Sequence, residues 1–210
     1  DFAGPGSETY QQIVLADSPT YYWTWNEASG AALNYGTGSG GILGAGSAAA
    51  RTASTTNAGG LSLGSAASFT GVVQQWWFTG STGGSVLNDG TYSSYAIEFW
   101  FFGSSSNSMY VSNVAPVGIL SNDPSVIFSY QASPDNNFEL FTQGLPQRTG
   151  AAFPAISLNA WHHVVLAYQS VSDGTDIQTC IIDGNYAGRT STATLEGKVY
   201  RADNYAFIIG

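Results

Sequence analysis

The chain has 210 residues, a length that suits one large all-β domain, and only 9% of them are charged. Its formal net charge is −9 at pH 7, and its five basic residues form no cluster that would neutralise a run of phosphates, so we expect no nucleic-acid partner. No run of 18 or more apolar residues occurs, so we expect no insertion into a membrane.

The first organised segments predict a short helix and a strand. Residues 10–18 are typical of a single helical turn, which Pro19 ends. Residues 20–27 alternate bulky and polar side chains, as a half-buried strand does. The Gly-, Ala- and Ser-rich stretch 28–60 predicts loops around one or two short strands, because a compact domain rarely holds so long a structureless segment. No longer segment has helical periodicity, so helix content should be low.

The rest of the chain predicts short antiparallel strands. Residues 95–102 are the most apolar run and are bulky on both faces, as expected in the middle of a sheet. The runs 161–168 and 176–185, closed by a turn at Asp183 and a glycine, predict adjacent antiparallel strands. This spacing favours a sandwich, and we expect 1–210 to be a single domain. Other strand candidates are 61–63, 67–69, 72–78, 117–120, 126–130, 138–142 and 205–209.

Cys180 is the only cysteine, so the chain forms no internal disulfide. It lies within an apolar strand candidate, where a free cysteine usually behaves as a small buried hydrophobe. We therefore expect a packed thiol without a nucleophilic role.

Six short motifs follow one another across nearly the whole chain. They are VLADSPTYYW at 14–23 with NEASG at 26–30, ASFTG at 67–71, IEFW at 97–100, NAWHHVV at 159–165, IIDG at 181–184 and FIIG at 207–210. In this order they resemble the laminin G-like branch of the concanavalin A-like lectin and glucanase family. The resemblance implies an all-β fold, a two-sheet antiparallel jelly-roll sandwich with little helix.

The resemblance also implies a further strand and a metal site. Members of the family usually continue into one more strand that carries an acidic residue. We therefore expect this chain either to be a fragment or to leave a sheet edge that another chain completes. Many relatives bind calcium, and the resemblance points to Glu27 and Asn34 as its ligands. Calcium needs six to eight oxygen ligands, so we expect no cofactor, with calcium as the alternative. If Glu27 binds no metal, we expect its carboxylate to accept hydrogen bonds from the backbone N–H groups of the turn at 28–30.

Catalytic residues are hard to find in the sequence. Laminarinase-type relatives carry two glutamates and an aspartate alternating along one strand, because retaining hydrolysis needs two carboxyls about 5 Å apart. Here Glu98 stands alone among apolar neighbours, and no nucleophile-elbow motif begins a Ser/His/Asp series. His162 and His163 point to opposite faces of a strand, so they cannot bind one metal together, and one imidazole should pack inside the sandwich. We therefore expect that the chain is not an enzyme.

The aromatic residues are the remaining candidates for ligand binding. Trp76, Trp77 and Trp25 have the indole faces on which sugar rings stack. However, adjacent strand residues alternate sides, so one of Trp76 and Trp77 must belong to the core. We prefer the interpretation that these tryptophans serve packing or a protein contact.

Two functions fit these observations. The first is a non-catalytic structural, decoration or adhesion module that contacts protein neighbours on the exterior of a larger assembly, such as a virion capsid, fibre or cell-surface array. The alternative is a lectin-like carbohydrate-binding module, with or without calcium, and a glycoside hydrolase fits less well. The low charge favours the first function and an extracellular or virion-surface location. Residues 1–6 and 45–57 are then expected to be flexible arms.

Overall fold

The computed structural model shows strands as the main regular structure, with one short helix among the residues it describes. The strand pairs that it describes are antiparallel, and the strands form separate layers, so the prediction of an all-β sandwich with little helix is confirmed. In the same part of the chain, no helix is long and apolar enough to cross a membrane. The structure describes residues 9–38, 41–45, 50–56, 62–69, 77–79, 94–103, 109–114, 126–131, 136–144, 147–170, 175–193 and 206–209.

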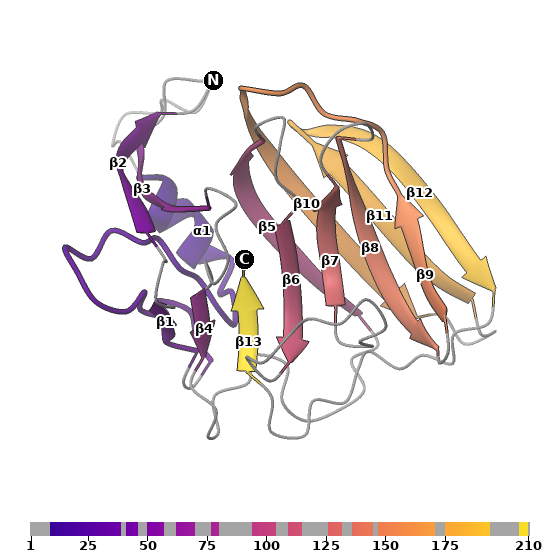
Figure 1. Cartoon of the computed structure of the whole chain (residues 1–210), viewed down its shortest axis with the longest axis horizontal. Coiled ribbons are helices and arrows are strands. Elements are labelled where there is room, and N and C mark those ends of the chain that lie inside the picture. The colour runs from indigo at the N-terminus through magenta and orange to yellow at the C-terminus, as the bar shows by residue number, and fades with distance from the viewer. Residues whose placement is uncertain are drawn as a thin grey trace.

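Two larger sheets make up the sandwich (Figure 1). The seven-stranded sheet has the strand order β1-β4-β13-β6-β7-β8-β9, and the four-stranded sheet has the order β12-β11-β10-β5. β2 and β3 form a separate two-stranded sheet. The bounds are β1 Leu43–Ala45, β2 Ala50–Thr56, β3 Ser62–Ser68, β4 Trp77–Thr79, β5 Ser94–Phe102, β6 Met109–Val114, β7 Val126–Gln131, β8 Asn137–Gly144, β9 Gln147–Ala152, β10 Trp161–Ser170, β11 Thr175–Ile182, β12 Asn185–Ala193 and β13 Ala206–Ile209.

β10 lies within the four-stranded sheet, between β5 and β11. The predicted antiparallel pairing of 161–168 with 176–185 is therefore confirmed. The predicted turn also forms, with Asp183 at φ 52° and Gly184 at φ 74°. Two successive left-handed residues are what a tight two-residue hairpin turn requires, and Asp-Gly adopts them at low cost.

The run 95–102 departs from its predicted place in the middle of a sheet. β5 ends the four-stranded sheet, with β10 as its neighbour. The bulky residues on both faces of β5 are therefore not explained by a central position in the sheet. Phe99 and Phe101 point inward and pack against the core, while Trp100 points outward and meets Tyr10 of the helix, with ring centroids 6.3 Å apart. The second apolar face of β5 is therefore covered by a helix.

That helix, α1, spans Tyr10–Ala16 and begins in a capping box. The Thr9 hydroxyl accepts from the Gln12 backbone N–H, and the Gln12 side chain accepts from the Thr9 backbone N–H, so two N-terminal donors are satisfied. The helix ends at Asp17, two residues before Pro19. The predicted helix before Pro19 is thus confirmed.

Residues 20–27 form no regular strand, contrary to the prediction. The Tyr22 backbone N–H donates to the side chain of Asn34, 2.9 Å away, so side-chain bonding replaces a strand ladder there. The predicted alternation of side chains nevertheless holds. The rings of Tyr21 and Trp23 stack with centroids 5.8 Å apart and pack against the core.

The segment 45–57, predicted as a flexible arm, contains a strand. β2 pairs with β3 over Ala50↔Ser68 to Thr56↔Ser62, with two irregularities in the register. The prediction for this segment is therefore wrong, because its Thr- and Ser-rich residues have a pairing partner within the chain. The other predicted arm, 1–6, lies outside the described residues.

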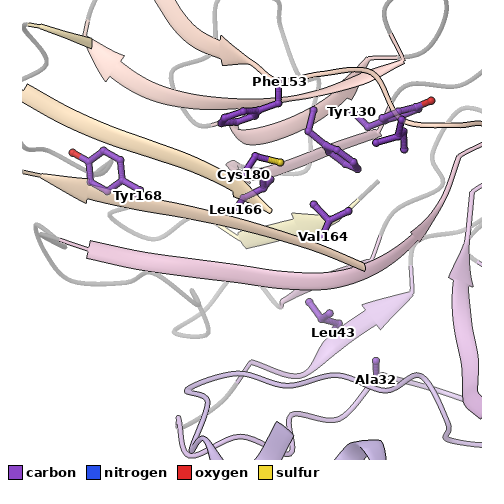
Figure 2. Close-up of a cluster of buried hydrophobic side chains, with 10 residues drawn as sticks. Ala32, Leu43, Tyr130, Phe153, Val164, Leu166, Tyr168 and Cys180 are labelled. Carbon is purple, nitrogen blue, oxygen red and sulfur yellow. The ribbon is translucent and has the colours of Figure 1, made fainter. Parts of the chain in front are cut away.

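The core lies between the two larger sheets. Val164, Leu166 and Cys180 of the four-stranded sheet are fully buried, and Figure 2 shows them facing Tyr130 and Phe153. Each buried aliphatic or aromatic side chain contributes about 1.5–3 kcal/mol to folding. Burial also raises the pKa of the Cys180 thiol to about 12, so the prediction of a packed thiol is confirmed.

Candidate functional site

The structure does not show Trp25, Trp76 and Trp77, the predicted ligand-binding tryptophans, together in one site within the residues it describes. Trp25 is half-buried and packs against the core, with its backbone at φ 53°. Trp77 lies in β4, which pairs with β1 and β13, and its side chain is not described. Trp76 lies outside the described residues. The contacts of Trp25 fit the packing role, and the ligand role of Trp76 and Trp77 stays a prediction.

The predicted calcium ligands both engage protein donors. Glu27 Oε1 accepts from the Leu33 backbone N–H at 2.8 Å, and Glu27 Oε2 lies 3.5 Å from the Arg51 guanidinium. Glu27 is thus bonded to Leu33, beyond the turn at 28–30 that we expected to supply its donor. The Asn34 side-chain oxygen accepts from the Tyr22 and Gly36 backbone N–H groups, both at 2.9 Å. Within the described ranges, no three His, Cys, Asp or Glu side chains gather as metal ligands.

These contacts give a testable expectation for calcium. A cation at Glu27 would have to displace the Arg51 guanidinium, so we expect about 5 mM calcium to shift the melting temperature by less than about 1 °C. Thermal unfolding followed by circular dichroism, with and without chelator, measures this. A concentration-dependent rise of several degrees that Glu27→Gln abolishes would establish calcium binding instead.

The two consecutive histidines point to opposite faces, as predicted. His162 is buried, with 8% of its surface exposed, on the side of the core. His163 points outward, and its Nε2 donates to Glu98 Oε1 at 2.8 Å. This hydrogen bond lowers the pKa of the Glu98 carboxyl below its ordinary value. The Tyr10 hydroxyl donates to the same oxygen at 3.3 Å, so α1 is tied to the sheet at this point.

We call the outward-pointing side chains of the four-stranded sheet the outer face. Most of the described ones are apolar, and the chargeable groups among these are Glu98 and His163, which are hydrogen-bonded to each other. The strand register also places Arg189 on this face, opposite Thr179, and its side chain is not described. Phe102 is 45% exposed and Tyr186 63% exposed. The Phe102 and Trp161 rings lie side by side with centroids 5.5 Å apart. The described members are Ser94, Ala96, Glu98, Trp100, Phe102, Trp161, His163, Val165, Ala167, Gln169, Ile177, Thr179, Ile181 and Tyr186.

His162 lies in a hydrogen-bonded series at one end of β10. Its Nδ1 is 2.7 Å from Asp183 Oδ2, and because a carboxylate only accepts, Nδ1 carries a proton. Its Nε2 is 2.9 Å from the Ser157 hydroxyl and 3.0 Å from the Ser157 carbonyl oxygen. The other Asp183 oxygen accepts from the His163 backbone N–H at 2.9 Å. Serine, histidine and aspartate thus have the order and spacing of a nucleophile, its base and the group that orients the base.

The sequence does not predict this series, although His162 and Asp183 belong to the motifs at 159–165 and 181–184. The antiparallel register of β10 and β11 places the Asp183 turn beside His162 and His163, and that register was predictable from the hairpin. Ser157 belongs to the connection between β9 and β10, and its approach to His162 depends on the path of that loop. No nucleophile-elbow pattern marks it.

Comparisons with known proteins give little support for an identity. No family model matches the chain, and no curated protein matches it. The chain is similar to a solved structure of the conserved carbohydrate esterase vb_24B_21 from the Shiga toxin-encoding bacteriophage phi24B, with 15% sequence identity and a TM-score of 0.40. The match covers 77% of this chain and 81% of that one. The laminin G-like resemblance stays a prediction.

The expectation that the chain is not an enzyme does not stand. The similar structure belongs to a protein described as an esterase, although a TM-score of 0.40 transfers no activity to this chain. The expectation also rested on the lack of a reactive Ser/His/Asp series. The structure contains hydrogen bonds that join Ser157, His162 and Asp183, so that ground does not hold. The sequence did not reveal these contacts because they form only in the folded chain, where the loop before β10 and the turn after β11 meet at His162.

Proposed function

We propose that the chain is a structural or adhesion module that attaches to a larger assembly through the outer face of its four-stranded sheet. The assembly would be a virion surface, a fibre or an extracellular array, in keeping with a chain of which only 9% is charged. The observation that carries this proposal is the character of the outer face. α1 covers this face at Trp100 of β5, but over β10 and β11 a solvated antiparallel face would normally show polar side chains. Val165, Ala167 and Ile181 lie there instead.

The chemistry of the outer face fits a protein surface better than a sugar. Val165, Ala167 and Ile181 lie in its middle, where aliphatic carbon is only partly buried and the neighbouring Glu98 carboxylate accepts a hydrogen bond from His163. Neighbouring apolar side chains that remain partly exposed are typical of interaction sites, and Phe102 and Tyr186 add exposed rings to the same face. A glycan site would need several polar groups arranged to bind hydroxyls. We therefore favour a protein neighbour whose contact surface is apolar.

Placing a charge in the middle of the outer face tests the proposal. The partner is unidentified, so the probe is a second copy of the chain, whose apolar face should associate with a dissociation constant of about 0.1 mM or tighter. We expect Ala167→Glu to abolish this association in sedimentation equilibrium, because a carboxylate would be buried there without a partner. Ala155→Glu, the same change at an exposed loop residue, is the matched control.

Two results would contradict the proposal. One is a chain that stays monomeric at millimolar concentration, with Ala167→Glu indistinguishable from the unmodified protein. The other is specific binding to a glycan array that Phe102→Ala abolishes. The second result would favour the carbohydrate-binding alternative, with the exposed Phe102 ring beside Trp161 as its stacking surface.

A further inference from the structure

We propose that Ser157 is a nucleophile that accepts an acyl group from small carboxylic esters, with His162 as its base and Asp183 as the positioning residue. This activity goes beyond attachment through the outer face and depends on different side chains. It rests on the series from the Ser157 hydroxyl to His162 Nε2, at 2.9 Å, and from His162 Nδ1 to Asp183, at 2.7 Å. Both distances lie within the reach required for proton transfer.

The exposure of the three residues suits these roles. Ser157 is exposed, so an ester can approach its hydroxyl from solvent. His162 is 8% exposed and is therefore shielded from competing water. Asp183 is held through both oxygens, by His162 and by the His163 backbone N–H at 2.9 Å, which fixes the direction of its hydrogen bond to the imidazole.

The loop that carries Ser157 is anchored on both sides. The Ile156 backbone N–H donates to the Asn136 carbonyl at 2.8 Å, and the Ile156 side chain is buried. The Asn159 backbone N–H donates to the Gly103 carbonyl at 2.8 Å, with Asn159 at φ 59°. These bonds hold Ser157 and Leu158, the two residues between them, so the hydroxyl is positioned before any substrate arrives.

The tautomer of His162 that faces Asp183 with its Nδ1 proton can act as a base through Nε2. In the neutral tautomer with its proton on Nδ1, facing Asp183, Nε2 has a lone pair for the Ser157 hydroxyl proton, and the Ser157 carbonyl oxygen 3.0 Å away then accepts no hydrogen bond from it. Once protonated, Nε2 also has the Ser157 carbonyl oxygen within 3.0 Å as an acceptor. The same carbonyl therefore stabilises the imidazolium that the first step produces.

The reaction balances without a cofactor. The Ser157 oxygen attacks the ester carbonyl carbon while its proton passes to His162 Nε2. The carbon–oxygen bond to the leaving alcohol then breaks, and the alcohol takes that proton, leaving an acyl-serine. Water, deprotonated by the same nitrogen, attacks the acyl-serine and releases the carboxylic acid and the free hydroxyl.

The test uses p-nitrophenyl acetate as the acyl donor and the full chain as the protein. We expect release of p-nitrophenolate and an acetyl group on Ser157, located by tandem mass spectrometry after acid quenching. Ser157→Ala should lose both, and Asp183→Asn should slow acetylation by a factor of about 10²–10⁴. Ser157→Cys should restore acylation, on the thiol. Ser29→Ala removes another exposed serine hydroxyl and serves as the matched control.

The same experiment separates catalysis from a structural role. If the series only ties the loop to the turn, Ser157→Ala and Asp183→Asn will lower the melting temperature, but the unmodified chain will carry no acetyl group at Ser157. That outcome overturns the proposal, as does equal p-nitrophenolate release by the unmodified chain and Ser157→Ala. Neither outcome bears on association through the outer face, which is measured by sedimentation.

Discussion

Replacing Phe138 by alanine is expected to lower the free energy of unfolding by about 3–5 kcal/mol. Phe138 is fully buried on β8, in the seven-stranded sheet. Its ring lies 5.5 Å from Phe99 and 5.1 Å from Phe101, both on β5 of the opposite sheet, and 5.4 Å from Tyr130. The phenyl group therefore joins the two layers, and its removal leaves a cavity lined by rings that have little freedom to collapse.

Urea denaturation measures this loss as a lower midpoint with an unchanged slope. Tyr186→Ala is the control, because it removes another aromatic ring from a strand at a position that is 63% exposed. Surface substitutions of this kind usually change stability by no more than about 0.5 kcal/mol. Equal effects of the two substitutions would show that Phe138 is not at the centre of the core.

The strands of the four-stranded sheet could be predicted because local sequence determines them. The alternation in 161–168 sends His162 and Val164 inward and His163 outward, and an Asp-Gly pair supplies the left-handed turn that follows β11. The edge position of β5 could not be predicted in this way. Its outer face is apolar because α1 covers Trp100, and a helix packed from elsewhere in the chain leaves no mark on the strand's own pattern.

The site was less accessible to sequence reasoning than the fold. Each of its residues has an ordinary local role, since Asp183 forms a turn and His162 is one of an inward-facing series on β10. Their meeting with Ser157 depends on the register of two strands and on the backbone bonds that anchor the loop before β10. Glu27 shows the same limit, because its partners Leu33 and Arg51 are set by the folded loop.

Replacing Gln178 by methionine is expected to raise the free energy of unfolding by about 1–3 kcal/mol. Gln178 is fully buried on β11, directly opposite Tyr168, which is 2% exposed. Neither its side-chain oxygen nor its side-chain nitrogen has a hydrogen-bond partner among the described residues. Methionine has nearly the same length and no polar group to desolvate, so it should fill the site without that cost.

The measurement is again the urea midpoint, with Gln169→Met as the matched control at an exposed position of β10. That control should be nearly neutral, because the Gln169 amide keeps its contact with water in the native chain. A loss of stability in Gln178→Met would contradict the expectation. It would mean that the buried amide is bonded to a trapped water, whose removal leaves the water's other partners unsatisfied. A gain would show that the buried Gln178 amide lowers the stability of the native chain, since an apolar residue of similar length avoids its desolvation cost.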